Sequence, residues 1–153
     1  MAEPHLTASG SVSESPLILT DITLGSGVVG RSLIFTYTPA ALKPTADLIK
    51  NLEPLIIDDP LSPAETEQKL RKRFRLLGTQ GLVAMALSAI HMALWDALAR
   101  THDMSLVRLL GGIEKPLQPC GAIGYDGVVG ANRYSVNFHL RSNQCRQHQR
   151  YAN

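Results

Sequence analysis

Cysteine is scarce in this sequence, and so is charge of either sign. Two cysteines in 153 residues, Cys120 and Cys145, are too few for the disulfide framework of a small secreted domain, so a reducing cytoplasm is the expected compartment. Charged residues make up 18% and hydrophobic residues 44% of the chain, which is typical of a globular protein rather than a disordered one. The N-terminus also lacks the charged, apolar and small-residue succession of a signal peptide.

The chain has no strong net charge that would indicate a nucleic-acid partner. Its formal net charge is +2, and the excess comes from residues 128–153, which contain no acid and four arginines (Arg133, Arg141, Arg146 and Arg150). The remaining residues are slightly acidic. The basic run at 71–75 is interpreted as an exposed helix face with one buried aromatic residue, Phe74. We therefore expect no nucleic-acid partner.

The longest apolar stretch with a regular period is residues 81–111. Apolar side chains recur there at helical spacing, at Val83, Ala86, Leu87, Ile90, Ala93, Leu94, Ala97 and Leu98. A helix that is apolar on nearly all sides must be enclosed by protein or by lipid. Asp96 lies within it, and an acid near the centre of a membrane helix costs roughly 2.5–3.5 kcal/mol. The sequence therefore favours a helix packed between protein layers, not a membrane span.

The residues before this helix predict an antiparallel hairpin followed by further helices. Residues 16–23 and 28–35 are typical of two strands, and the glycine-rich sequence between them is typical of a turn. Helices are expected to begin at Pro39, capped by Thr38, and at Pro63, within a capping box that starts at Ser62. A last helical turn is expected after a cap at Ser105. The predicted fold class is α+β, with a hairpin and a three-helix bundle.

Other candidate sites have only weak patterns. Asp58 and Asp59 stand beside a proline, which is typical of a solvated turn. Four potential zinc ligands occur at Cys120, His139, Cys145 and His148, but their spacing matches no ordinary zinc finger. No serine or cysteine lies in a nucleophile motif. The sequence thus predicts no catalytic residue and no metal ligand.

The sequence ALSAIHMALWDALAR, followed by SLVRLLG, resembles the N-terminal signature of the mandelate racemase and muconate lactonising group of the enolase superfamily. Small residues stand at Ala86, Ser88, Ala89, Ala93 and Ala99, with an acid at Asp96 and a base at Arg100. His91 departs from the pattern, since the family usually has Asp, Glu or Gln there. The resemblance covers residues 4–127. It implies an enolase-like N-terminal capping domain at 16–112, and at 113–127 the linker into the first strand of a (β/α)8 barrel.

The resemblance also implies residues that bind substrate. PHLTASGSV is similar to the lid loop that covers the substrate in mandelate-racemase-like enzymes. Residues 1–15 are thus expected to be a lid-like loop whose ligand-facing residues are His5, Leu6, Ser9 and Val12; a disordered terminus is the alternative. The FTYTP segment implies that Phe35 and Tyr37 are walls of the substrate pocket. Plain core aromatics at a strand end are the alternative there.

The chemistry of the superfamily needs groups that this sequence does not supply. In that reaction a Lys or His base removes the proton from the carbon next to a carboxylate, and Mg²⁺ stabilises the resulting enediolate. Acidic residues on the barrel strands hold the Mg²⁺ ion. Those strands would follow residue 127, and no Lys-x-Lys pair occurs in the chain. Residues 128–153 are instead interpreted as an unpatterned basic tail that is expected to be disordered. We expect this tail to be translated from an unrelated reading frame appended to a broken gene. We therefore expect no cofactor in this chain and no racemase activity, although the full-length family uses magnesium.

Three functional hypotheses follow. The first is that the chain is the capping and substrate-specificity domain of a truncated racemase-like enzyme. The reaction of the parent enzyme would be Mg-dependent proton abstraction from a 2-hydroxy acid or a sugar acid. Aromatic 2-hydroxy acids are the favoured substrates. Such a carboxylic-acid substrate is expected only if a barrel is supplied. The second is a non-catalytic binding module that forms a homo-oligomer or associates with an intact relative. The third is a basic-tailed nucleic-acid binder.

Overall fold

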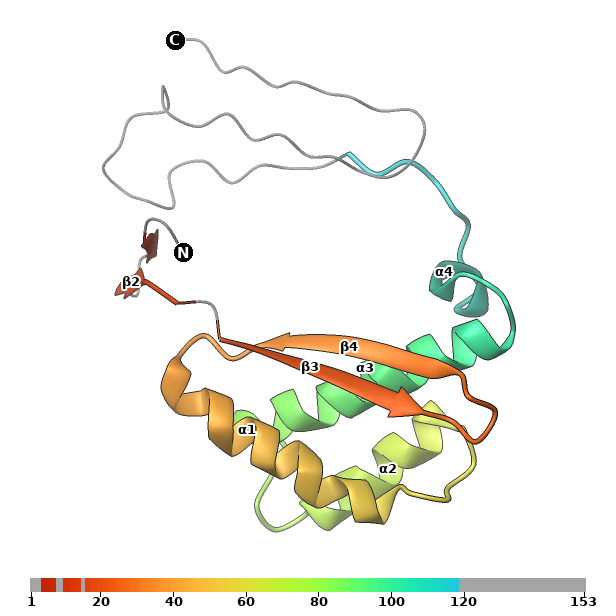
Figure 1. The fold of residues 1–153 in the computed structure, drawn as a ribbon, viewed down its shortest axis with the longest axis horizontal. Coiled ribbons are helices and arrows are strands. Elements are labelled where there is room, and N and C mark those ends of the chain that lie inside the picture. The colour runs from red at the N-terminus through yellow and green to blue at the C-terminus, as the bar shows by residue number, and fades with distance from the viewer. Residues whose placement is uncertain (1–3, 8–9, 15, 119–153) are drawn as a thin grey trace, which may run out of the picture. The chain divides into compact units, whose positions relative to one another are not determined.

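The computed structural model describes residues 4–7, 10–14 and 16–118. The chain divides into two units, one of residues 14–115 and one of residues 1–13 with 116–153. The larger unit contains, in chain order, β3 (Leu17–Thr23), β4 (Val29–Phe35), α1 (Pro39–Leu52), the 3-10 turn η1 (Glu53–Leu55), α2 (Pro63–Arg73), α3 (Leu82–Thr101) and α4 (Leu106–Leu109) (Figure 1). The predictions for residues 119–153, including the four zinc ligands, fall outside the described residues.

Strands β3 and β4 form the predicted antiparallel hairpin. Its register runs from the pair Leu17–Phe35 to the pair Thr23–Val29. The turn is closed by hydrogen bonds from the Leu24 N–H to the Val28 carbonyl (2.8 Å) and from the Gly27 N–H to the Leu24 carbonyl (2.9 Å). Because side chains alternate along a strand, Ile18 and Ile22 share the face that packs on the helices, while Leu17, Leu19, Asp21 and Thr23 are exposed on the other face.

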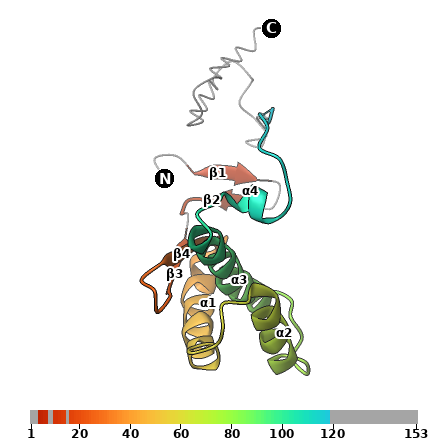
Figure 2. The same ribbon diagram turned by 90° about the vertical axis from the view of Figure 1, so that its right-hand side faces the viewer.

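Helix α3 is the centre of the larger unit, as its periodicity predicts. Figure 2 shows it between α1 and α2, and it also packs against both strands of the hairpin. The core cluster around it consists of Leu52, Leu70, Val83, Ala86, Leu87, Ile90 and Leu94. By length and composition alone α3 could span a membrane, but 50% of its most apolar stretch is buried inside the protein, as in a core helix. The fold class is α+β with a three-helix bundle, as expected.

The predicted helix starts are correct, but the predicted caps are wrong. Thr38, Ser62 and Ser105 occupy the N-cap positions, yet none of them makes a side-chain hydrogen bond to its helix. The Ser105 hydroxyl donates instead to a carboxylate oxygen of Glu114, at 2.7 Å. Proline at the first helical position of α1 and α2 already fixes the backbone angle there and removes one unpaired N–H. The helices therefore begin at the expected residues without the capping box.

The smaller unit contains a short hairpin where the sequence suggested a loop. Strands β1 (His5–Thr7) and β2 (Gly10–Val12) pair antiparallel, with His5 opposite Val12 and Leu6 opposite Ser11. Gly10 has a φ of 128°, which lies in the region open to glycine. Three-residue strands carry too little hydrophobic pattern to be recognised in a sequence rich in Ser, Gly and Pro.

Candidate functional site: an aromatic corner on a small-residue platform

The two predicted pocket-wall residues lie together where β4 leads into α1. The ring centroids of Phe35 and Tyr37 are 4.6 Å apart and the rings are tilted by 47°. Phe35 is half-buried, whereas 67% of Tyr37 is exposed. The structure therefore brings Phe35 and Tyr37 into one surface, which we call the aromatic corner. Tyr37 is not a core aromatic residue.

The backbone holds Tyr37 in a conformation that a bulky side chain rarely adopts. Its φ is 62°, in the left-handed region that costs an L-residue roughly 1–2 kcal/mol. The preceding residue, Thr36, is buried and its N–H donates to the Pro16 carbonyl at 3.0 Å, which fixes the strand end. The Thr38 N–H then donates to the Thr36 carbonyl at 2.7 Å. Strain of this kind persists only where the surroundings fix the backbone, and it is concentrated at functional sites.

The outer face of the hairpin continues the aromatic corner with exposed leucines. Leu17 lies opposite Phe35 and Leu19 lies opposite Leu33 in the register. The three leucines are 47%, 74% and 51% exposed, in the order Leu17, Leu19 and Leu33. Apolar side chains gathered on one exposed face are typical of a surface that another protein layer covers.

The small residues of the signature let the hairpin approach α3 closely. A Cβ atom on Gly30 would lie 2.1 Å from the Ala93 carbonyl oxygen and 2.6 Å from the Ala97 Cβ. Beside this contact the Ser32 hydroxyl donates to the Ala89 carbonyl, at 2.7 Å. Ala89, Ala93 and Ala97 are fully buried and recur every fourth residue, so they form one stripe under β4. The stripe is the platform that positions the aromatic corner.

Asp96, the acid of the signature, ties this platform to β4. One of its carboxylate oxygens accepts hydrogen bonds from the Arg31 backbone N–H (2.8 Å) and from Arg100 Nε (2.7 Å). Burial opposes ionisation of Asp96, but these hydrogen bonds and the two guanidinium charges outweigh it and lower the pKa of the carboxyl. Asp96 is therefore an ionised structural acceptor.

His91, which departs from the signature, joins α3 to α2. Its Nε2 atom accepts a hydrogen bond from Trp95 Nε1 at 2.9 Å and lies 3.3 Å from a carboxylate oxygen of Glu67. The hydrogen bond from Arg71 Nε lowers the pKa of the Glu67 carboxyl; burial acts against this and the charges of His91 and Arg71 act with it. The histidine is thus accommodated in the signature by the hydrogen bond from Trp95 within α3 and by a polar neighbour, Glu67, on α2.

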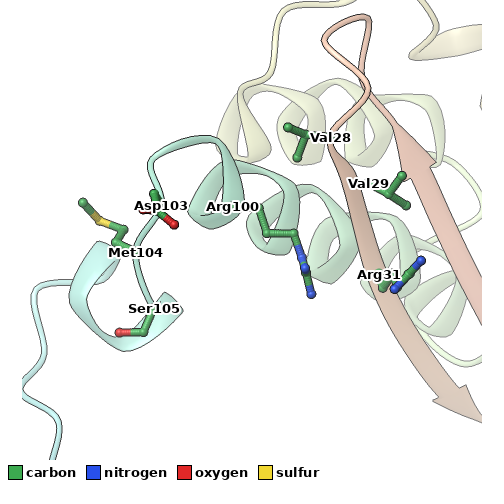
Figure 3. Close-up of a pocket in the computed structure, with 7 residues that line it drawn as sticks. All are labelled: Val28, Val29, Arg31, Arg100, Asp103, Met104 and Ser105. Atoms are coloured by element: carbon green, nitrogen blue, oxygen red, sulfur yellow. The ribbon is translucent and has the colours of Figure 1, made fainter.

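A shallow hollow of about 620 Å³ lies between the hairpin and the end of α3 (Figure 3). Arg31 and Arg100 line it together with Asp103, Met104 and Ser105. Both cations are already paired, because Arg31 Nε is 3.5 Å from Asp21 and Arg100 Nε binds Asp96. This hollow is therefore not a strong candidate for binding an anionic substrate.

The predicted lid residues lie in the smaller unit. His5 and Val12 are directly opposite each other, and Leu6 is next to His5 on β1. Val12 is half-buried. Ser9 lies outside the described residues. The expectation that His5, Leu6, Ser9 and Val12 face a ligand remains a prediction.

A magnesium site does not fit the described part of the chain. Within residues 4–7, 10–14 and 16–118 there is no group of three or more His, Cys, Asp or Glu side chains that could hold a metal ion. Mg²⁺ prefers several oxygen ligands at close to octahedral geometry. No catalytic step through Mg²⁺ can therefore be built from the described residues.

Comparison with known proteins identifies the family. Residues 1–111 match the model of the mandelate racemase / muconate lactonizing enzyme N-terminal domain, so the chain belongs to this family. The larger unit is accordingly an enolase-type N-terminal capping domain, as the signature predicted.

Solved structures and one curated relative agree with this assignment. An enolase from Bradyrhizobium in complex with magnesium and mandelic acid is 40% identical, with a TM-score of 0.70 over 76% of this chain and 32% of that one. An enolase from an alphaproteobacterium, BAL199, with bound magnesium is 37% identical, with a TM-score of 0.69 over 74% of this chain and 31% of that one. The o-succinylbenzoate synthase of Geobacillus stearothermophilus is 28% identical over 132 residues, 82% of this chain and 34% of the relative. The chain therefore spans about a third of the length of the proteins it matches.

Proposed function

We propose that this chain is a capping domain that shapes the substrate pocket of a mandelate-racemase-like enzyme but does not itself carry out proton transfer. The observation that carries the proposal is the aromatic corner, where Tyr37 is exposed, stacked near Phe35 and held at a positive φ. An apolar wall of this kind recognises the ring of an aromatic 2-hydroxy acid through stacking and burial. The complex of a 40% identical enolase with mandelic acid supports this class of substrate.

The proton transfer would then come from a barrel that contributes the base and the metal ligands. The groups of the aromatic corner are a phenyl ring and a phenol, which supply shape and one hydroxyl group. Proton abstraction next to a carboxylate requires a base within hydrogen-bonding reach and an electrophile for the developing enediolate. The isolated chain is therefore proposed to be inactive, with a carboxylic-acid substrate bound only when a barrel completes the pocket.

A chimera tests this role of the aromatic corner. Residues 16–112 would replace the corresponding domain of the Bradyrhizobium enolase, and kcat and KM would be measured with mandelate. Tyr37→Ala is expected to raise KM about five- to tenfold through the lost aromatic contact. Tyr37→Phe retains the ring and should stay within about twofold, because stacking does not need the hydroxyl. Equal effects of both variants, or none, would contradict the proposal.

A second candidate function, association with an intact relative, is supported by the outer face of the hairpin. Leu19 and Leu33 are directly opposite each other and both are more than half exposed. Mixing the chain with an intact homologue, followed by size-exclusion chromatography, tests it. Co-elution that Leu19→Lys abolishes would support this function, whereas separate elution at micromolar concentrations would argue against it.

A further inference from the structure

One ring nitrogen on α3 has two neighbours that it cannot bind at the same time. The Nε2 atom of His91 lies 2.9 Å from Trp95 Nε1 and 3.3 Å from a carboxylate oxygen of Glu67. The indole nitrogen can only donate a hydrogen bond, whereas an ionised carboxylate can only accept one. A ring nitrogen of neutral histidine is either a donor or an acceptor, and never both. The protonation state of His91 therefore decides which neighbour Nε2 binds.

Neutral His91 binds Trp95. The hydrogen bond from Trp95 Nε1 requires a lone pair on Nε2, so the ring hydrogen is on Nδ1. Trp95 lies one turn after His91 on the same helix, and its ring stands edge-on to the imidazole with the two ring planes 74° apart. In this state the hydrogen bond stays within α3, and Glu67 receives no hydrogen from Nε2.

Protonated His91 binds Glu67 instead. Both ring nitrogens of a protonated histidine are donors, so the indole N–H would face another N–H and its bond is lost. The two oxygens of the Glu67 carboxylate are used separately. Arg71 Nε donates to one of them at 2.8 Å, and His91 Nε2 is beside the other. That second oxygen can accept a bond from α3 without displacing Arg71.

Glu67 and Arg71 are the charged groups of α2 that face His91. The hydrogen bond from Arg71 lowers the pKa of the Glu67 carboxyl, and the opposing effect of burial does not cancel this, so the carboxylate is ionised where histidines titrate. Within residues 16–118 the other elements packed on α3 make no hydrogen bond or ion pair with His91. Their charges pair elsewhere: Asp21 with Arg31 in the hairpin, Asp47 with Lys43 on α1, and Glu114 with Arg108 after α4.

The contact is closed toward the core and open toward solvent. The gap between α2 and α3 beside His91 is lined by Thr66, Leu70, Leu87 and their neighbours and has no room for a water molecule. The side chains of His91 and Glu67 are each 32% exposed. Protons can therefore reach the imidazole from solvent, while no water within the gap can take the place of either partner.

We propose that His91 is an acid-sensitive contact between α3 and α2, the two helices that lie side by side in Figure 2. Its Nε2 atom accepts the hydrogen bond of Trp95 when the ring is neutral and donates to Glu67 when the ring is protonated. Acidification transfers one hydrogen bond from within α3 to the contact between the helices and releases the indole N–H. The fold is the same in both states, because only side-chain bonds change. This inference does not depend on the proposed enzymatic role.

The indole N–H reports the exchange directly, because Trp95 is the only tryptophan of the chain. ¹H–¹⁵N correlation spectra of the full, ¹⁵N-labelled chain would be recorded from about pH 8 to about pH 5, the range in which histidine changes charge. We expect the single indole resonance to move upfield in the proton dimension as its hydrogen bond is lost. An indole resonance that does not move would overturn the proposal.

Three variants identify the groups involved, with circular dichroism confirming that each is folded. His91→Gln keeps an oxygen that can accept from Trp95 but cannot be protonated in this range, so its indole resonance should not move. His102→Gln removes an exposed histidine at the end of α3 and should titrate like the wild type. Glu67→Gln removes the anion, so the change should occur at lower pH, by less than about one pH unit. Movement that persists in His91→Gln, or that Glu67→Gln leaves at the same pH, contradicts the exchange of partners.

The tautomer of His91 gives a test that needs no variant. Long-range ¹H–¹⁵N spectra of the histidine rings distinguish a protonated nitrogen from an unprotonated one. At about pH 8 the hydrogen of His91 should be on Nδ1, with Nε2 unprotonated. A hydrogen on Nε2 at that pH would show that the ring does not accept from Trp95, and the proposal would fail.

Discussion

Replacement of Asp96 by alanine should destabilise the larger unit far more than its single position on α3 suggests. The change removes one acceptor that serves two donors, the Arg31 backbone N–H at 2.8 Å and Arg100 Nε at 2.7 Å. Hydrogen bonds to a charged group contribute roughly 1.5–3 kcal/mol each. Because the Asp96 side chain is 31% exposed, water can replace part of that interaction. We expect a loss of about 2–3 kcal/mol in the free energy of unfolding.

Urea or thermal denaturation followed by circular dichroism measures this loss. For a unit of this size it corresponds to a fall in Tm of about 8–24 °C. The matched control is Asp47→Ala, since Asp47 also forms an i,i+4 pair, with Lys43, but on an exposed surface. That variant should cost less than about 0.5 kcal/mol. If both variants cost the same, Asp96 does not link β4 to α3 as described.

The pH dependence of the stability lost in Asp96→Ala gives an independent check. The pKa of Asp96 is lowered in the folded protein, so its contribution is present above the ordinary pKa of an aspartate and is lost as the pH falls through the lower, folded value. The difference in stability between the wild type and Asp96→Ala should therefore be full at pH 7 and shrink as the pH falls below about 4. A difference that stays constant down to pH 2 would contradict an ionised acceptor.

Three further predictions concern the platform and the core. Gly30→Ala should lower the free energy of unfolding by about 3 kcal/mol or more, because the added Cβ would overlap the α3 backbone. The control Gly25→Ala, whose Cβ would meet nothing within 4 Å, should lower it by less than about 1 kcal/mol. Thermal melting compares the two variants. Leu70→Ala should cost about 2–5 kcal/mol in a urea titration, because Leu70 is 2% exposed in the core cluster. Glu67→Gln should slightly destabilise the protein at pH 7, and because the pKa of Glu67 is lowered in the folded protein, this difference in unfolding free energy should shrink as the pH falls through that lowered value; a difference that grows as the pH falls through that value would contradict this.

The central helix and the hairpin could be predicted from the sequence because each carries its own period. Of the eight apolar positions expected to be buried on α3, all but Leu98 are buried. The signature also marks Ala89 and Ala93 as small without saying what they contact. The reason lies far earlier in the chain, at Gly30 for Ala93 and at Ser32 for Ala89, and no local pattern connects these positions. Close approach of two elements is a property of the packed fold.

The geometry of the aromatic corner was beyond sequence analysis for a similar reason. Tyrosine gives no signal for a positive φ, since Gly and Asn are the residues that normally occupy it. Its conformation at Tyr37 is imposed by Thr36, tied to Pro16, and by the helix that must begin at Pro39. Likewise, the polar neighbour of His91, Glu67, comes from α2. Its position depends on how two helices cross, which the spacing within α3 cannot indicate.

The most direct test of the central claim is the loss of the α-proton signal of mandelate in deuterated buffer, followed by ¹H NMR in the presence of Mg²⁺. The isolated chain is expected to give no exchange above the uncatalysed background, while the chimera that joins residues 16–112 to a barrel exchanges the proton. Exchange by the isolated chain, dependent on Mg²⁺ and abolished by a chelator, would show that the chain carries a base and a metal site of its own, and would contradict the account.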